Sequence, residues 1–210
     1  MKWGIDVASQ RLPSYYRYLD ELHSMGVQSI SSAVLSEKIG ISSSLARKDI
    51  SQFGGFGQTA YGYDVPEIRA RLGHVLGVDN LRCAIMIGTG CLSHALLKYV
   101  HFETAGFIVI AAFENAPGSI DREYNGIPIL GMSELERIVQ THRPDVAVLT
   151  PSNDSMKMTA RRLARMGIRG FWNFSGEDLA LDEPDCRVEN VNLIESLLQL
   201  SYRITPGDER

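Results

Sequence analysis

Residues 84–93 have the sequence Ala-Ile-Met-Ile-Gly-Thr-Gly-Cys-Leu-Ser, and this stretch decides the fold of the second part of the chain. The apolar run predicts a buried strand, the glycines predict a tight turn, and the residues after the turn predict the start of a helix. Backbone N–H groups and the positive end of the helix dipole converge at such a turn. The stretch therefore predicts a place where a diphosphate binds.

The turn carries a dinucleotide motif with one departure. Two glycines shape the turn and admit the diphosphate, but a serine stands where the third glycine usually packs the helix against the strand. Serine is small, so the substitution weakens the match without cancelling it. The residues predicted to hold the dinucleotide at this turn are Gly88, Thr89, Gly90, Cys91, Leu92 and Ser93.

The chain on either side of the motif alternates between strand and helix patterns. Strands are expected at 81–87, 107–113, 145–150 and 169–174, and helices at 92–100, 133–141 and 154–166. Alternation at these lengths predicts an α/β domain with a parallel sheet covered on both faces. Ser133 and Glu136 predict a capping box, and Gly167 predicts a helix stop. We expect a Rossmann-like domain over residues 79–190.

Two further positions are expected to contact the dinucleotide. Glu114 ends the second strand, where a carboxylate accepts hydrogen bonds from the adenine ribose and repels a 2′-phosphate, so it favours NAD(H) as the cofactor. A glutamate that is merely solvated is the alternative. Thr150 and Pro151 follow the third expected strand and are predicted to border the nicotinamide.

The first eighty residues predict short helices. Pro13 suits a first helical turn and Gly26 suits a stop; a serine cap and Gly40 bound a second helix, and Ser42 or Ser43 caps a third, with Phe53 directed inward. The last two helices form a helix-turn-helix, whose later helix enters the major groove. The polar residues that it is predicted to present to DNA are Ser43, Ser44, Arg47, Lys48, Ser51 and Gln52.

A plain three-helix bundle with a solvated basic face is the alternative for this segment. The glycine-rich stretch 54–65 is typical of a short twisted hairpin, and a hairpin directly after a recognition helix is a wing. Pro66 then opens a further helix that ends at Gly77. We therefore expect a winged helix-turn-helix domain over residues 1–78.

Composition limits the other classes of protein. The net charge is −4, so any contact with nucleic acid must come from a local basic cluster. The three cysteines follow neither a disulfide nor a zinc pattern, and no metal is expected. Cys91 is either an oxidisable thiol at a helix N-terminus or an ordinary loop residue. No window approaches the roughly 18 apolar residues of a membrane span, so a cytoplasmic protein without a membrane partner is expected.

The whole chain resembles the Rex family of NADH-responsive transcriptional repressors. Six segments carry the resemblance: Arg11-Leu12-Pro13, Tyr15-Tyr16-Arg17-Tyr18-Leu19, Arg47-Lys48-Asp49-Ile50-Ser51, Phe53-Gly54, Gly62-Tyr63 and Asn173-Phe174. The resemblance implies a homodimer that binds a double-stranded DNA operator when NADH is scarce and leaves it when NADH binds. It also implies that a C-terminal helix, residues 191–210, is exchanged between subunits. That exchange would bury the apolar residues of this segment.

The resemblance also assigns residues to roles. Arg11 and the wing residues Gln58 and Thr59 are implied to contact DNA, although the family usually has a basic residue in the wing. Arg17 and Tyr99 are implied to couple dinucleotide to DNA through a residue at position 192. The family usually has aspartate there, and Asn192 carries no charge. A simpler alternative is that Asn192, with Glu195, caps the last helix.

The leading hypothesis is therefore a DNA-binding repressor that senses the ratio of NADH to NAD+ and is not an enzyme. A divergent paralogue that binds DNA with a weakened NADH response is the first alternative. A small NAD-dependent oxidoreductase is the second, but the sequence shows no substrate domain and no obvious proton donor, since His94 and His101 belong to the first helix of the domain and the turn after it.

Overall fold

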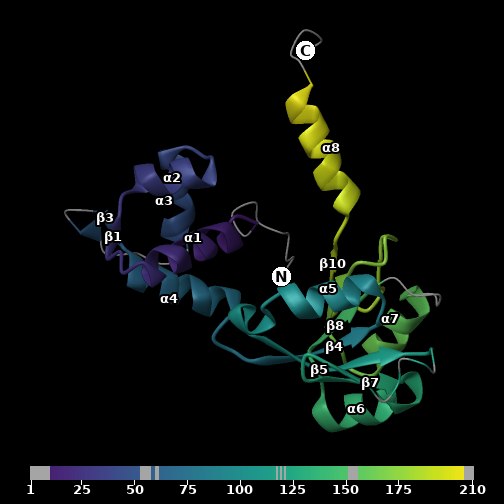
Figure 1. Cartoon of the computed structure of the whole chain (residues 1–210). Helices are drawn as coiled ribbons and strands as arrows, with labels where there is room; N and C mark the ends of the chain where they lie inside the picture. Colours follow the sequence, from purple (N-terminus) through teal and green to yellow (C-terminus); the bar gives the residue numbers. More distant parts are fainter. Residues whose placement is uncertain are drawn as a thin grey trace. The chain divides into compact units, whose positions relative to one another are not determined.

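The protein is described by a computed structural model of residues 10–52, 58–59, 62–116, 118, 120, 122–150 and 156–205. The chain forms two compact units, Met1–Asn80 and Leu81–Arg210 (Figure 1). Each unit has its own hydrophobic core, so each is described by itself. The further division at residue 190 stays a prediction.

The first unit contains four helices and three short strands in its described part. The strands form an antiparallel sheet in the order β1-β3-β2, in which β2 and β3 are the expected hairpin. The elements are α1 (Leu12–Ser24), β1 (Ser29–Ile30), α2 (Ser32–Ile39), α3 (Ser43–Gln52), β2 (Gln58–Thr59), β3 (Gly62–Asp64) and α4 (Val65–Leu76). This is the helix-turn-helix with a wing that the sequence predicts.

Local capping explains where these helices begin and end. The Ser31 side chain accepts a hydrogen bond from the Val34 N–H at the start of α2, and Gly40 ends that helix in a left-handed conformation with φ of 78°. Asp64 caps α4 in the same way, through the Glu67 N–H. Phe53, expected to point inward after α3, lies outside the described residues.

One glycine is required by close backbone approach. A Cβ atom at Gly62 would lie 2.5 Å from the Ile30 carbonyl oxygen, and its φ of 123° also disfavours other residues. The hairpin can therefore pair with β1 because this position is glycine.

The second unit is a seven-stranded sheet in the order β10-β9-β8-β4-β5-β7-β6. All neighbours are parallel except β6 and β7. With β6 set aside, the strands taken in chain order give the arrangement 3-2-1-4-5-6 of a doubly wound dinucleotide-binding fold. The strands are β4 (Arg82–Ile87), β5 (Phe107–Glu114), β6 (Arg122–Tyr124), β7 (Ile127–Gly131), β8 (Val146–Leu149), β9 (Gly170–Asn173) and β10 (Arg187–Asn190).

Helices cover both faces of this sheet, as expected for a parallel sheet (Figure 1). On one face α6 (Leu135–His142) and α7 (Met156–Arg165) pack on alternate residues of the central strands, including Ile85 and Phe113. On the other face α5 (Cys91–Tyr99) and the 3-10 helix η1 (Phe102–Ala105) pack on the residues between them, including Met86 and Ala112. The central strands are therefore buried from both sides.

Four features of this unit differ from what the sequence predicts, namely three strands and one helix cap. The strands β6, β7 and β10 were not expected, because each is short and lies at or next to a sheet edge, where no long apolar run is needed. The capping box at Ser133 is wrong. Ser133 lies inside a 3-10 helix, η2 (Met132–Glu134), and Glu134 precedes α6 without a side-chain cap.

The last helix, α8 (Leu193–Ile204), has no buried residue. Its exposed apolar side chains are Leu193, Ile194, Leu197, Leu198, Leu200, Tyr202 and Ile204. Exchange of this helix between subunits stays a prediction. No helix in the described part of the chain is long and apolar enough to cross a bilayer.

Candidate nucleic-acid interface and dinucleotide site

Helix α3 presents the polar face that the sequence predicts. Ser42 precedes the helix, and its hydroxyl accepts a hydrogen bond from the Leu45 N–H at 3.3 Å. Ala46 and Ile50 are buried in the core of the unit. The residues predicted to contact DNA that α3 leaves exposed are Ser44, Arg47, Lys48, Ser51 and Gln52, and Ser43 is half-buried. Their contact with DNA stays a prediction.

The serines of this helix have partners within the unit. The Ser43 hydroxyl lies 2.8 Å from that of Ser36, and the Ser44 hydroxyl lies 3.0 Å from that of Ser42. The Ser51 hydroxyl donates to the Lys48 carbonyl at 2.8 Å. An exposed hydroxyl can exchange such a local bond for a phosphate oxygen.

An acidic residue is buried in the middle of α3. The side chain of Asp49 is 3% exposed, and Arg11 donates two hydrogen bonds to it, each of 2.7 Å. The Tyr15 hydroxyl donates a third at 3.0 Å. These contacts join the recognition helix to α1 and give Arg11 a structural role. Its predicted DNA contact could use only the guanidinium N–H groups that Asp49 leaves free.

This cluster shifts the pKa values of its members. The hydrogen bonds from Arg11 lower the pKa of Asp49, against the opposing effect of burial. Burial and the hydrogen bond to Asp49 raise the pKa of the Tyr15 hydroxyl. Asp49 is therefore ionised and Tyr15 is neutral near pH 7.

The wing residues are placed by their backbone. Gln58 and Thr59 form β2, which pairs with Gly62 and Tyr63 of β3. Their side chains lie outside what the structure describes, so their contact with DNA stays a prediction.

The dinucleotide motif lies where the strand order reverses. The carboxyl ends of β4 and β8, which are neighbours in the sheet, mark this switch point, where doubly wound folds bind their ligands. Gly88 leaves β4 with a φ of 91°, and Gly90 precedes the first turn of α5 without a side-chain cap. The N–H groups of Cys91 and Leu92 begin that helix, where an anion is bound favourably.

Glu114 is held in place beside this turn. One carboxylate oxygen accepts hydrogen bonds from the Thr89 N–H at 3.0 Å and from the Thr89 hydroxyl at 2.7 Å. The other accepts from the N–H groups of Asn115 and Ala116. Burial opposes the charge, but these hydrogen bonds outweigh it and lower the pKa of Glu114. The residue is therefore an oriented anion and not a freely solvated one.

Ser93, the departure from the glycine motif, is fully buried and hydrogen-bonded. Its hydroxyl donates to the Gly88 carbonyl at 2.8 Å and lies 2.7 Å from the hydroxyl of Thr150. The structure thus brings together Ser93 and Thr150, which the sequence places in the same site. Pro151, the next predicted residue, lies outside the described part of the chain.

The residues implied to couple the two functions lie in both units. Asn192 caps α8, because its side-chain oxygen accepts from the N–H groups of Ile194 and Glu195 at 3.0 and 3.3 Å. The simpler alternative for Asn192 is therefore present in the structure. Arg17 is exposed on α1, and Tyr99 is 69% exposed at the end of α5. Their coupling role stays a prediction.

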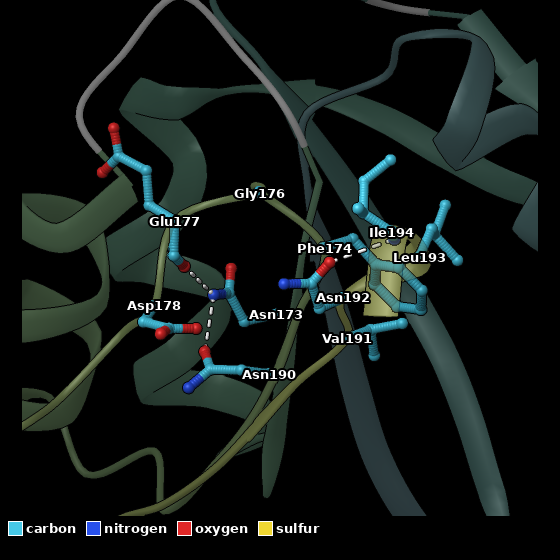
Figure 2. Close-up of a pocket in the computed structure, with 10 residues that line it drawn as sticks. All are labelled: Asn173, Phe174, Gly176, Glu177, Asp178, Asn190, Val191, Asn192, Leu193 and Ile194. Atoms are coloured by element: carbon cyan, nitrogen blue, oxygen red, sulfur yellow. Dashed lines mark hydrogen bonds between the residues drawn. The ribbon is translucent and has the colours of Figure 1, made fainter. Parts of the chain in front are cut away.

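A small pocket lies between the carboxyl ends of β9 and β10 and the start of α8 (Figure 2). Its volume is about 190 Å³, below the roughly 300 Å³ at which small-molecule sites begin. The Asn173 amide closes it by donating to the Glu177 carbonyl and to the Asn190 side chain, both at 2.7 Å (Figure 2). The pocket is a feature of local structure. The sequence does not indicate that Asn190 is a hydrogen-bond partner of Asn173.

No group of His, Cys, Asp and Glu in the described ranges could hold a metal ion. The described parts of the two sites thus consist of hydrogen-bonding groups and a helix N-terminus. Together they define a class of protein: a winged helix-turn-helix DNA-binding domain followed by a dinucleotide-binding domain.

Comparison with known proteins identifies the family within this class. The chain is 39% identical over 195 residues to the redox-sensing transcriptional repressor Rex of Thermoanaerobacter sp. (strain X514), covering 93% of this chain and 87% of that protein. It is 38% identical over 198 residues to the Rex of Clostridioides difficile (strain 630), covering 94% of each. The chain belongs to the family of redox-sensing transcriptional repressors called Rex.

Family models and solved structures agree with this. Residues 6–51 match the family model "Putative DNA-binding protein N-terminus", and residues 79–176 match the "CoA binding domain" model. The crystal structure of RSP in complex with β-NAD+ and operator DNA is similar, with a TM-score of 0.88, 37% identity, and coverage of 96% of this chain and 93% of that chain. RSP in complex with β-NADH gives a TM-score of 0.87, 35% identity, and coverage of 97% and 95%.

Proposed function

We propose that this protein is a transcriptional repressor that binds a DNA operator through α3 and the wing, and releases it when NADH occupies the switch point of the second unit. The observation that carries the proposal is the presence, in one chain, of an exposed basic recognition helix and a dinucleotide fold with an oriented glutamate. The similarity to a protein crystallised with β-NAD+ and operator DNA supports it over 96% of the chain.

Each part of the dinucleotide has residues suited to it. The diphosphate would lie on the first turn of α5, against the N–H groups of Cys91 and Leu92. The adenine ribose would lie beside Glu114, whose ionised carboxylate accepts hydrogen bonds from the ribose hydroxyls and repels a 2′-phosphate. The nicotinamide would lie toward Thr150. This arrangement selects NAD(H) over its phosphorylated form.

The response requires a difference in affinity. A ligand shifts the equilibrium between two arrangements of the protein only by the difference in its affinity for them. NADH must therefore favour the arrangement that does not fit DNA, and must favour it by more than NAD+ does. We propose that Arg17, Tyr99 and Asn192 transmit this preference. The protein performs no chemistry on the ligand, and so it is a sensor and not an enzyme.

The proposal includes a homodimer. Seven apolar side chains of α8 are 52% to 71% exposed, and large exposed apolar areas on soluble proteins mark interaction sites. Packing α8 against a second copy would cover these side chains. We expect Leu198→Glu, which places a charge in this patch, to convert a dimer into a monomer in sedimentation experiments.

The DNA half of the proposal is tested with a duplex selected from a random-sequence pool by the full-length protein in NAD+. Arg47→Ala should weaken binding to that duplex by about 1 to 3 kcal/mol if Arg47 contacts a guanine. Lys157→Ala is the matched control, because it removes one exposed positive charge from α7 and should leave the affinity unchanged. If Arg47→Ala binds the duplex with unchanged affinity, α3 is not the helix that enters the major groove.

The ligand half is tested by calorimetry with NADH and NAD+ separately. Binding of both dinucleotides, together with release of the selected duplex when NADH is added, supports a redox sensor. Absence of NADH binding at millimolar concentration, with DNA binding intact, would instead indicate a paralogue that has lost the response.

A further inference from the structure

The hydroxyl groups of Ser93 and Thr150 form a linked pair in the interior of the second unit. Ser93 lies in the first turn of α5 and is 0% exposed, and Thr150 follows β8 and is 1% exposed. Their oxygen atoms are 2.7 Å apart. The pair therefore connects the helix that begins the diphosphate site to the strand on the other side of the switch point.

Counting protons shows how the pair is arranged. Two hydroxyl protons serve three contacts: Ser93 with the Gly88 carbonyl at 2.8 Å, Thr150 with the Ile87 carbonyl at 2.9 Å, and the two hydroxyls with each other. The Ile87 carbonyl already accepts from the Thr150 N–H at 3.0 Å. A carbonyl oxygen accepts two hydrogen bonds, so the two hydroxyl protons are shared among the Gly88 carbonyl, the Ile87 carbonyl and the contact between the hydroxyls.

In this chain the Ser93 hydroxyl donates a hydrogen bond to the carbonyl of Gly88, the first glycine of the turn. Burying a serine hydroxyl without a partner is unfavourable, so its two bonds are what make serine acceptable at a position suited to glycine. The bonds also restrain both ends of the turn, because one end is Gly88 and the other is the first turn of α5.

We propose that Ser93 and Thr150 form a hydroxyl clamp that positions the diphosphate-binding turn and thereby sets the affinity for the diphosphate part of the ligand. This inference rests on the proposed dinucleotide binding. Both are positioning residues, since the N–H groups at the start of α5 would make the contact to the ligand. The clamp predicts that its loss affects ligands with a diphosphate and spares those without one.

The experiment measures dissociation constants of the full-length protein for NADH, for ADP-ribose and for adenosine, which lacks the diphosphate. Ser93→Ala and Thr150→Val each remove one hydroxyl and should raise the constants for NADH and ADP-ribose by about threefold to tenfold, leaving adenosine unchanged. Thr150→Ser keeps the hydroxyl and is the conservative comparison, so it should weaken binding of ADP-ribose, which has no nicotinamide, by less than Thr150→Val does. Ser93→Gly restores the residue usual at this position, so it tests hydroxyl loss in a variant that the fold accommodates.

The double variant Ser93→Ala with Thr150→Val separates one shared bond from two independent roles. If the clamp acts as a unit, the double variant is weakened about as much as either single variant. Full additivity, an equal loss for adenosine, or unchanged NADH binding in Ser93→Gly and Thr150→Val would overturn the clamp. If the unmodified protein binds none of the three ligands, the proposed function itself fails.

Discussion

Arg11 binds both carboxylate oxygens of Asp49, through Nε and Nη2 at 2.7 Å each, although the two residues are 38 positions apart. The pair fastens the recognition helix to the start of α1. It also neutralises a buried carboxylate that directly follows the basic residues Arg47 and Lys48 in the helix. The orientation of the predicted DNA-contacting face therefore depends on an ion pair that does not itself need to touch DNA.

Replacing Asp49 by asparagine should destabilise the first unit. The variant keeps the shape of the side chain but loses the charge that Arg11 and Tyr15 bind, and hydrogen bonds to charged groups contribute about 1.5 to 3 kcal/mol each. We expect the free energy of unfolding to fall by roughly 1 to 3 kcal/mol in urea titrations. Glu37→Gln removes an exposed carboxylate from α2 and should change it by less than about 0.5 kcal/mol.

The same pair predicts how stability depends on pH. The pKa of Asp49 is lower in the folded protein than its ordinary value of 3.8, so its stabilising contribution is complete above that value and is lost as pH falls through the folded pKa. The stability difference between the unmodified protein and Asp49→Asn should be constant from about pH 5 to 7 and shrink below about pH 4. A difference that persists undiminished at pH 2 to 3 would contradict the assigned ion pair.

Glu114→Gln should reduce discrimination between NADH and NADPH. The neutral amide no longer repels a 2′-phosphate, and it accepts hydrogen bonds from the ribose less strongly. We expect the ratio of the NADPH and NADH dissociation constants to fall by about tenfold, which corresponds to about 1.4 kcal/mol. Glu103→Gln, an exposed carboxylate of η1, serves as the control and should leave the ratio unchanged.

Asn192→Asp should strengthen the response to NADH. Aspartate still caps α8, and its charge would pair with a guanidinium more strongly than the amide does. We expect NADH to lower the affinity for DNA by a larger factor in this variant, measured by anisotropy of a labelled duplex. Adding Arg17→Ala should remove the gain. A gain that survives the loss of Arg17 would mean that Asn192 acts elsewhere.

The fold was largely predictable because its signals are local. The strand-turn-helix pattern around Gly88 and Gly90 identified the dinucleotide domain, and a serine cap with a left-handed glycine bounded α2 in the first unit. The strands β6, β7 and β10 were missed because each is short and carries no long apolar run, although β6 and β7 form a local hairpin. The capping box at Ser133 failed because the chain there forms a 3-10 turn before the helix begins.

The roles of the candidate site residues stay predictions, and the partners of their side chains could not be predicted from the sequence. The sequence singled out Arg11, Glu114 and Ser93, yet their contacts with Asp49, Thr89 and Thr150 join segments that only the folded chain brings together. A partial signal existed for Asp49, because an acidic residue beside two basic ones on a DNA-facing helix needs either burial or a partner. For Ser93, no local pattern indicates which hydroxyl it meets.

We propose that the ratio of NADH to NAD+ governs DNA binding by this protein. The most direct measurement holds the total dinucleotide concentration constant, varies the ratio, and follows the anisotropy of the selected duplex bound to the full-length protein. We expect the duplex to be bound at low ratios and released progressively as the ratio rises, with no release when NADPH replaces NADH. Binding that stays the same at every ratio would contradict it.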